Sequence, residues 1–235
     1  MPLRSALHNW HLANGAVFRP VAGRELVAHY GSSEQEQDAR KRLGMVDMSL
    51  WPRRGYRGPE VARWLAPSLP LPDAVNQVQR TQSGELVLRP ADTEYWWLGS
   101  LAGPGPGEMS GLAPGRLPTG VHDLACEHSH ALFAVGGTQA PPCLSRLCAL
   151  DVRPDRFGPE SMAQTLVAGV SALLLRQGTP GLPVYLVFCE SSLARYLWES
   201  LLHAGREFGA AAAGYTALHG VLTQPTDAAF DGPPP

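Results

Sequence analysis

Short runs of apolar and aromatic residues, separated by turn residues, dominate the first hundred positions of the chain. Residues 85–88 (Glu-Leu-Val-Leu) and 95–98 (Tyr-Trp-Trp-Leu) are two β-rich runs with Arg-Pro-Ala-Asp-Thr-Glu between them. This arrangement favours a β-hairpin whose aromatic residues pack in a sheet. Residues 15–30 mix apolar side chains with two glycines and a proline, which is typical of an extended, turning segment.

Two helices are predicted in the same part of the chain. Residues 34–43 follow a capping box made by Ser33 and Glu36, with acidic residues in the first turns and basic residues in the last. Residues 45–49 then predict a brief strand. Residues 56–65 predict a strand, a Gly-Pro turn and a helix whose apolar side chains recur at helical spacing.

The same order of elements recurs after residues 99–120, a stretch rich in Gly and Pro that predicts a long loop. We interpret the recurrence as a diverged internal repeat. The elements predicted in the second half are a strand at 131–135, a short helix within 142–147, a strand at 149–152, a strand pair at 166–175 and 184–189, an amphipathic helix at 191–204 and an Ala-rich final helix at 208–222.

The composition describes an ordinary globular protein and narrows the classes of function. Hydrophobic residues make up 44% and charged residues 17% of 235 residues, enough for a substantial core in one compact unit. A net charge of −2 without a basic run gives no electrostatic footprint for nucleic acid. No segment approaches the roughly 20 apolar residues that span a bilayer, and no signal peptide is visible. We therefore expect a cytoplasmic protein with no membrane partner.

The densest polar cluster has residue types that bind zinc or iron, although it lacks a recognised ligand spacing. Surface loop and strand-edge histidines are the default interpretation, so no metal is predicted. Scattered cysteines indicate reduced, mostly buried thiols. The cluster consists of His122, Asp123, Cys126, Glu127, His128 and His130.

Asp47 and Ser49 are the polar residues most tightly embedded in an apolar context. A structural interpretation is that their short side chains satisfy backbone amides at the strand. The alternative is that they point into a ligand pocket, because a few convergent polar groups in an apolar cavity are typical of small-molecule sites.

Two further sets of positions carry a resemblance that extends over roughly residues 8–222. The first set comprises His11, Gly15, Ala16, Pro20, Ala22, Gly23, Glu25, Leu26, Tyr30, Arg40, Gly44, Asp47, Ser49, Gly58, Pro59 and Leu65. The second set comprises Asp123, Leu124, residues 148–157, Gln164, Thr165 and residues 191–202. The first set resembles the folate-binding part of the glycine cleavage T-protein (aminomethyltransferase) family, and the second is similar to the gamma subunit of heterotetrameric sarcosine oxidase.

The resemblance implies an α+β fold of two related antiparallel lobes around a tetrahydrofolate pocket, without the C-terminal barrel of the full T-protein. We expect one domain over residues 1–222, with lobes at about 8–98 and 121–222, and a disordered tail at 223–235. Tetrahydrofolate would accept a one-carbon unit from an aminomethyl or N-methyl group. The implied partners are a larger flavin-dependent or demethylase subunit and a small molecule, either a pterin or a methylated amine.

The acidic positions of the family fall on residues 82–85 and 178–185, where this chain keeps only Glu85. The resemblance and the residue pattern together nominate Glu85 and Asp47 as catalytic. The nominated cofactor contacts are Tyr30, Asp47, Ser49, Trp97 and Tyr185.

Three functions stay open at this point. The first is a tetrahydrofolate-binding, T-protein-like component of a demethylating or amine-oxidising system; if it is an enzyme, it is a folate-dependent aminomethyl or methyl transferase or a demethylase. The second is a non-catalytic interaction subunit of a larger oxidase or demethylase complex. The third is a repurposed pocket in which Glu85 or the cluster at residues 122–130 acts as acid or base.

Overall fold

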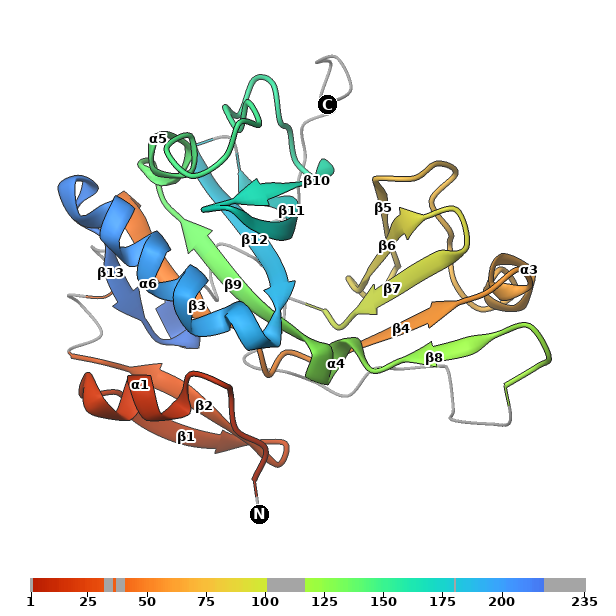
Figure 1. Ribbon diagram of the computed structural model, residues 1–235, viewed down its shortest axis with the longest axis horizontal. Helices are drawn as coiled ribbons and strands as arrows, with labels where there is room; N and C mark the ends of the chain where they lie inside the picture. The colour runs from red at the N-terminus through yellow and green to blue at the C-terminus, as the bar shows by residue number, and fades with distance from the viewer. Residues whose placement is uncertain (1, 32–35, 37–40, 101–116, 180, 218–235) are drawn as a thin grey trace.

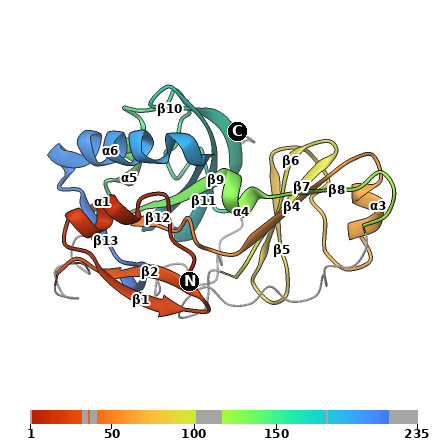
Figure 2. The same cartoon turned by 60° about the horizontal axis from the view of Figure 1, so that its bottom comes forward.

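The structure is a computed structural model that describes residues 2–31, 36, 41–100, 117–179 and 181–217. Its elements form two lobes that lie side by side (Figure 1), and the same division is visible in the turned view of Figure 2. We call the lobe around the five-stranded sheet the small lobe and the lobe around the six-stranded sheet the large lobe.

The small lobe is an antiparallel sheet with the strand order β5-β6-β7-β4-β8, and helix α3 packs on one of its faces. The predicted hairpin is confirmed, since β6 pairs with β7. Its elements are β4 (Arg53–Arg57), α3 (Val61–Leu65), β5 (Gln77–Arg80), β6 (Leu86–Ala91), β7 (Glu94–Leu98) and β8 (His122–Leu124).

The large lobe has the strand order β10-β11-β12-β9-β3-β13, and the two-stranded hairpin β1-β2 lies below it in Figure 1. Its first elements are α1 (His8–Ala13), β1 (Val17–Val21), β2 (Arg24–His29) and β3 (Gly44–Asp47). They are followed by α4 (Cys126–Ser129), β9 (His130–Gly136), α5 (Ala140–Leu144), β10 (Met162–Val167), β11 (Val170–Thr179), β12 (Leu182–Glu190), α6 (Ala194–Gly205) and β13 (Ala211–Ala213). Three short 3₁₀ turns cover Ser191–Leu193, Arg206–Phe208 and Tyr215–Ala217.

The amphipathic helix predicted at residues 191–204 is confirmed as α6 and the 3₁₀ turn before it. Leu197 and Trp198 each lie about one helical turn before Leu201, and all three are fully buried against the large sheet. Because these side chains recur at intervals of three and four residues, they form one apolar stripe that holds the helix on the sheet.

An apolar cluster fills the space between the lobes. Leu86 and Leu88 of β6 belong to this cluster with Leu173 and Leu175 of β11, whereas Val87 faces the opposite side and packs in the core beneath α3. Successive side chains of a strand point to opposite faces of the sheet, so a single strand contributes to both cores. The two lobes are therefore packed on each other through buried aliphatic side chains.

The fold class is confirmed, since the described residues form an α+β fold of two lobes with mainly antiparallel sheets and no closed barrel. The sheets divide the chain differently from the expected lobes at 8–98 and 121–222. All strands of the small lobe come from residues 53–124, whereas the large sheet combines β3 with strands that follow residue 130. A single domain over residues 1–222 stays a prediction.

The helix predicted at residues 208–222 is wrong for its described part. Ala211–Ala213 form β13, which pairs in parallel with β3. Gly214 follows this strand, and a Cβ there would lie 1.7 Å from the Ala28 carbonyl oxygen. Tertiary pairing and this close approach of two backbones outweigh the helical propensity of alanine.

Two further predicted boundaries are corrected. The run at 166–175 is divided by a turn at Ala168 and Gly169, which both have positive φ, so it contributes to β10 and β11. Residues 149–152 form bends and irregular chain. The predicted tail and most of the predicted loop at 99–120 and helix at 34–43 lie outside the described residues. Within the described ranges, no helix is long and apolar enough to cross a membrane.

Candidate functional site

Arg80, at the end of β5, lies where the small and large lobes touch. It bonds to Gly84, within the nominated segment 82–85, and to Gln177, which directly precedes the nominated segment 178–185. Its side chain donates to the Gly84 carbonyl oxygen at 3.3 Å and to Oε1 of Gln177 at 2.7 Å. Its Nε also donates to Oε1 of Glu160 at 2.6 Å. We call Arg80, Glu85, Glu160 and Gln177 the interlobe junction.

Glu85 is buried in the turn between β5 and β6, with 5% of its surface exposed. Ser83 Oγ donates to Oε2 of Glu85 at 3.0 Å, and the Glu85 backbone N–H donates to Thr81 Oγ1 at 3.0 Å. The carboxylate is therefore held in a fixed orientation by its own turn.

Glu160 has a backbone conformation that is unusual for a residue with a side chain. Its φ is +61°, in the left-handed region, and its N–H donates to the Arg176 carbonyl oxygen at 2.8 Å. Such conformations cost about 1–3 kcal/mol and are common at functional sites. No sequence pattern marks Glu160, because its distinguishing features are a backbone angle and a contact with a residue 80 positions away.

A second polar group is buried in the large lobe, where it joins α1, β2 and β3. Asp47 Oδ2 accepts from Ser5 Oγ at 2.5 Å and from His11 Nε2 at 2.8 Å, and Oδ1 accepts from the Ser49 N–H at 2.9 Å. His11 Nδ1 contacts the Tyr30 hydroxyl. Ser49 Oγ in turn accepts from the Leu132 N–H at 3.2 Å. The structure thus brings together three predicted residues, Tyr30, Asp47 and Ser49.

Electrostatics favour an ionised Asp47 beside a protonated Tyr30 hydroxyl. Burial acts to raise the pKa of Asp47, but the hydrogen bond and charge of His11, with those from Ser49 and Ser5, hold it below its ordinary value. Burial, and then the nearby charges of Asp47 and Glu36, raise the pKa of Tyr30 well above its ordinary range. Each acceptor oxygen of Asp47 already has a partner, which agrees with the structural interpretation of this residue.

Trp97 and Tyr185, the other two nominated cofactor contacts, lie in separate cores. Trp97 is 2% exposed and packs in the small lobe beneath α3. Tyr185 is fully buried in the large lobe, where its hydroxyl donates to the Val152 carbonyl oxygen and its ring stacks on Phe157 at 6.4 Å. The structure does not bring these two residues to each other or to Asp47.

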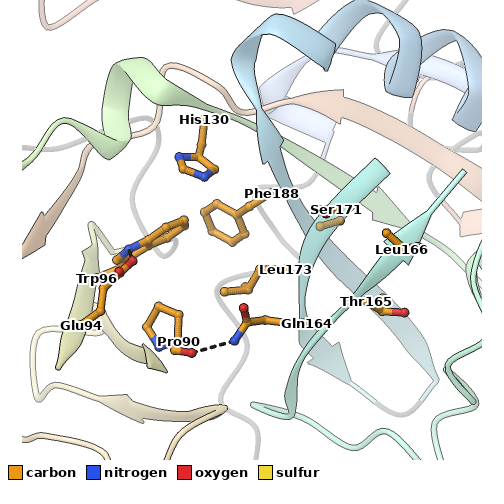
Figure 3. A pocket seen from close by; sticks show the side chains of 11 residues that line it. Pro90, Glu94, Trp96, His130, Gln164, Thr165, Leu166, Ser171, Leu173 and Phe188 are labelled. Carbon is orange, nitrogen blue, oxygen red and sulfur yellow. Dashed lines mark hydrogen bonds between the residues drawn. The ribbon is translucent and has the colours of Figure 1, made fainter. Parts of the chain in front are cut away.

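The described part of the chain also holds a cavity of about 510 Å³ between the lobes (Figure 3). Rings of Trp96, His130 and Phe188 wall it on one side, and Glu94 and Gln164 contribute polar groups. No sequence pattern predicts this cavity, because its lining residues come from six separate strands: β6, β7, β9, β10, β11 and β12.

The polar cluster at residues 122–130 is organised by a buried arginine. Arg53 is 2% exposed and donates to the carbonyl oxygens of Cys126, Glu127 and His130. Burial raises the pKa of the Cys126 thiol to about 12, against the opposing effect of Arg53, so this thiol is a poor nucleophile. No group of three His, Cys, Asp or Glu side chains among the described residues is placed to hold a metal ion.

Two mainly antiparallel lobes packed on each other through an apolar cluster form the T-protein folate-binding fold. The sequence pattern of the GCVT N-terminal domain family matches residues 86–222, more than half of the chain. The chain belongs to this family.

Curated relatives agree with this assignment. The chain is 28% identical over 223 residues to an aminomethyltransferase of Symbiobacterium thermophilum, a match that covers 88% of this chain and 59% of that protein. It is also 28% identical over 219 residues to an aminomethyltransferase of Streptomyces coelicolor, covering 88% of this chain and 58% of that protein. The chain therefore spans less than two thirds of the length of these relatives.

Solved structures share the fold. Aminomethyltransferase T of the glycine cleavage system from Bartonella henselae aligns with a TM-score of 0.69 at 18% identity, covering 92% of this chain and 61% of that one. A chain of the heterotetrameric sarcosine oxidase from Corynebacterium sp. U-96 aligns with a TM-score of 0.58 at 21% identity, covering 76% of this chain and 93% of that one. The resemblance that the sequence carries is confirmed.

Proposed function

We propose that this protein is a tetrahydrofolate-binding component of a one-carbon transfer system that acts in the cytoplasm. Bound tetrahydrofolate would supply the acceptor for a one-carbon unit released from an aminomethyl or N-methyl group. Family membership and the curated aminomethyltransferases support the reaction class. The observation that carries the proposal is the interlobe junction, where Arg80 links Gly84 of one nominated segment to Gln177, the residue next to the other.

The residues at this junction fit a pterin by their chemistry. Glu85 and Glu160 provide carboxylates and Gln177 provides an amide, and these groups accept hydrogen bonds from N–H donors. The family's usual glutamates are absent from residues 178–185 of this chain. Glu160 bonds to the same arginine as Gln177 and supplies a carboxylate there. In this proposal Glu85 and Glu160 orient the ring and Glu85 accepts a proton during transfer.

Isothermal titration calorimetry with tetrahydrofolate tests this proposal. We expect binding at micromolar concentrations and a loss of at least tenfold in affinity for Glu85→Gln and for Glu160→Gln. The matched control is Glu199→Gln, because Glu199 is an exposed glutamate on α6 that pairs with Arg195 at 2.9 Å. An absence of heat at tens of micromolar protein would refute the proposal, as would equal effects of all three substitutions.

A non-catalytic interaction subunit is the second candidate. It is favoured by the internal pairing of Asp47, which leaves that carboxylate engaged with Ser5, His11 and Ser49. The aligned chain from a heterotetrameric oxidase supports it further. We expect this protein to copurify from its native source with a larger flavin-dependent or demethylase subunit that acts on a methylated amine. A native chain that is monomeric and catalytically competent alone would contradict this candidate.

A further inference from the structure

The cavity in Figure 3 has an aromatic wall built by three strands. The Trp96 ring on β7 lies 4.7 Å from the His130 ring on β9 and 5.7 Å from the Phe188 ring on β12, measured between centroids. Both pairs are edge-to-face. At about 510 Å³ the cavity lies in the range that small-molecule sites occupy, and its aromatic rings offer apolar surface and a negative electrostatic face.

The charge of the lining has one sign. Glu94 is the only acidic residue among the eleven that line the cavity, and no lysine or arginine is among them. Burial, and then the nearby positive charge of Arg53, lower the pKa of His130, so its imidazole is neutral at pH 7. A single carboxylate beside aromatic rings attracts a cation and disfavours an anion.

The N–H donors of the Trp96 and Gln164 side chains are already engaged. Trp96 Nε1 donates to Oε1 of Glu94 at 2.7 Å, which fixes the carboxylate against the aromatic wall. Gln164 Nε2 donates to the Pro90 carbonyl oxygen at 2.6 Å and to Asn76 Oδ1 at 3.0 Å, so both of its amide hydrogens are used. Glu94 and Gln164 therefore present acceptors to a ligand, namely the Glu94 carboxylate and the Gln164 carbonyl oxygen.

We propose that this cavity binds a small organic ammonium ion, with its charged nitrogen beside Glu94 and its carbon skeleton against Trp96 and Phe188. An ammonium group supplies a positive charge and N–H donors for the Glu94 carboxylate and the Gln164 carbonyl oxygen, and the aromatic wall contacts the attached carbon atoms. The proposal is independent of folate binding, because it concerns residues other than those of the interlobe junction.

Three probes with one skeleton and different charges test the proposal by calorimetry with the full chain. They are benzylammonium, benzyl alcohol and benzoate. We expect benzylammonium to bind at least tenfold more tightly than benzyl alcohol, and benzoate not to bind at 10-fold higher concentration than benzylammonium requires. Equal affinities, a preference for benzoate, or no binding of any probe up to about 10 mM would overturn the proposal.

Substitutions test where benzylammonium binds and distinguish a loss of binding from a loss of folding. Glu94→Gln keeps an oxygen that can accept from Trp96, so the fold is retained while the charge is lost. It is expected to weaken benzylammonium about tenfold and to leave benzyl alcohol unchanged. Asp92→Asn is the matched control in the same hairpin, since the Asp92 side chain is 88% exposed and does not line the cavity. Equal losses in both variants would refute the role of Glu94.

A second variant keeps the test decisive if Glu94→Gln does not fold. Thr165 lines the cavity from the edge strand β10, so Thr165→Lys places a positive charge at its rim. Benzylammonium binding is expected to fall at least tenfold in this variant, while benzyl alcohol is unaffected. Unchanged benzylammonium affinity in folded Thr165→Lys, verified by circular dichroism, would place the ion elsewhere and overturn the proposal.

Discussion

Replacing Asp47 with asparagine is expected to lower the free energy of unfolding by about 3 kcal/mol. The substitution keeps the size of the side chain but removes its charge and turns one oxygen into an NH₂ donor. That group must then face either the Ser49 N–H or the donors of Ser5 and His11, which all donate to Asp47 in the native protein. Whichever way the amide is oriented, at least one buried donor meets another donor.

The magnitude follows from these three hydrogen bonds. A hydrogen bond to a charged acceptor contributes about 1.5–3 kcal/mol, and a buried donor left without an acceptor costs about 1–3 kcal/mol. His11 is 1% exposed and the Asp47 side chain 3%, so water does not reach the vacated partners. A loss near 3 kcal/mol is a large part of the 5–15 kcal/mol typical of a folded domain, yet it leaves the protein folded.

Urea denaturation followed by tryptophan fluorescence at pH 7 measures the difference. Asp92→Asn, on the exposed β6–β7 turn, is the control and is expected to change stability by less than about 0.5 kcal/mol. Because the folded-state pKa of Asp47 is below its ordinary value, its contribution is complete above about pH 5 and is lost as pH falls through that lowered pKa. The gap between wild type and Asp47→Asn should therefore shrink below about pH 4.

Two results would refute this reasoning. The first is an Asp47→Asn variant as stable as the wild type at pH 7, which would mean that the buried hydrogen bonds are worth little. The second is a gap that persists undiminished at about pH 3, since protonation should by then have removed part of the native carboxylate's advantage. Either outcome would favour the alternative interpretation, in which Asp47 contacts a ligand.

Three other predictions concern packing, charge and thiol reactivity. Gly205→Ala should destabilise the protein by about 1–3 kcal/mol in urea, since its Cβ would lie 2.4 Å from that of Ala210, whereas Gly181→Ala, with nothing within 4 Å, should be nearly neutral. Arg80→Gln removes the partly exposed ion pair to Glu160 and should cost about 1 kcal/mol in the same assay, less at high salt. The three buried thiols, whose pKa values burial raises to about 11 or about 12, should resist iodoacetamide at pH 8 until urea is added; rapid labelling of the native protein would contradict this.

Residue patterns predicted some members of the candidate sites but not their partners. Asp47 and Ser49 stood out because they are short polar residues in an apolar run, and they do share one buried network. Their partner His11 lies 36 positions from Asp47, and the sequence contains no signal for that pairing. The sequence does not predict a role for Glu94 for the same reason, since aromatic rings of the same cavity come from other strands that the fold brings together.

The sequence by itself determined the local structure where composition or spacing is distinctive. The β6–β7 hairpin was predicted because two β-rich runs flank a turn-forming stretch, and the α6 stripe was predicted because apolar residues recur at helical spacing. Only the tertiary structure decided that Ala211–Ala213 form a parallel strand and that β3 joins strands from the other half of the chain. A periodic pattern specifies that a face is buried, whereas the partner that buries it depends on how distant segments pack, which is how the junction and the cavity arise.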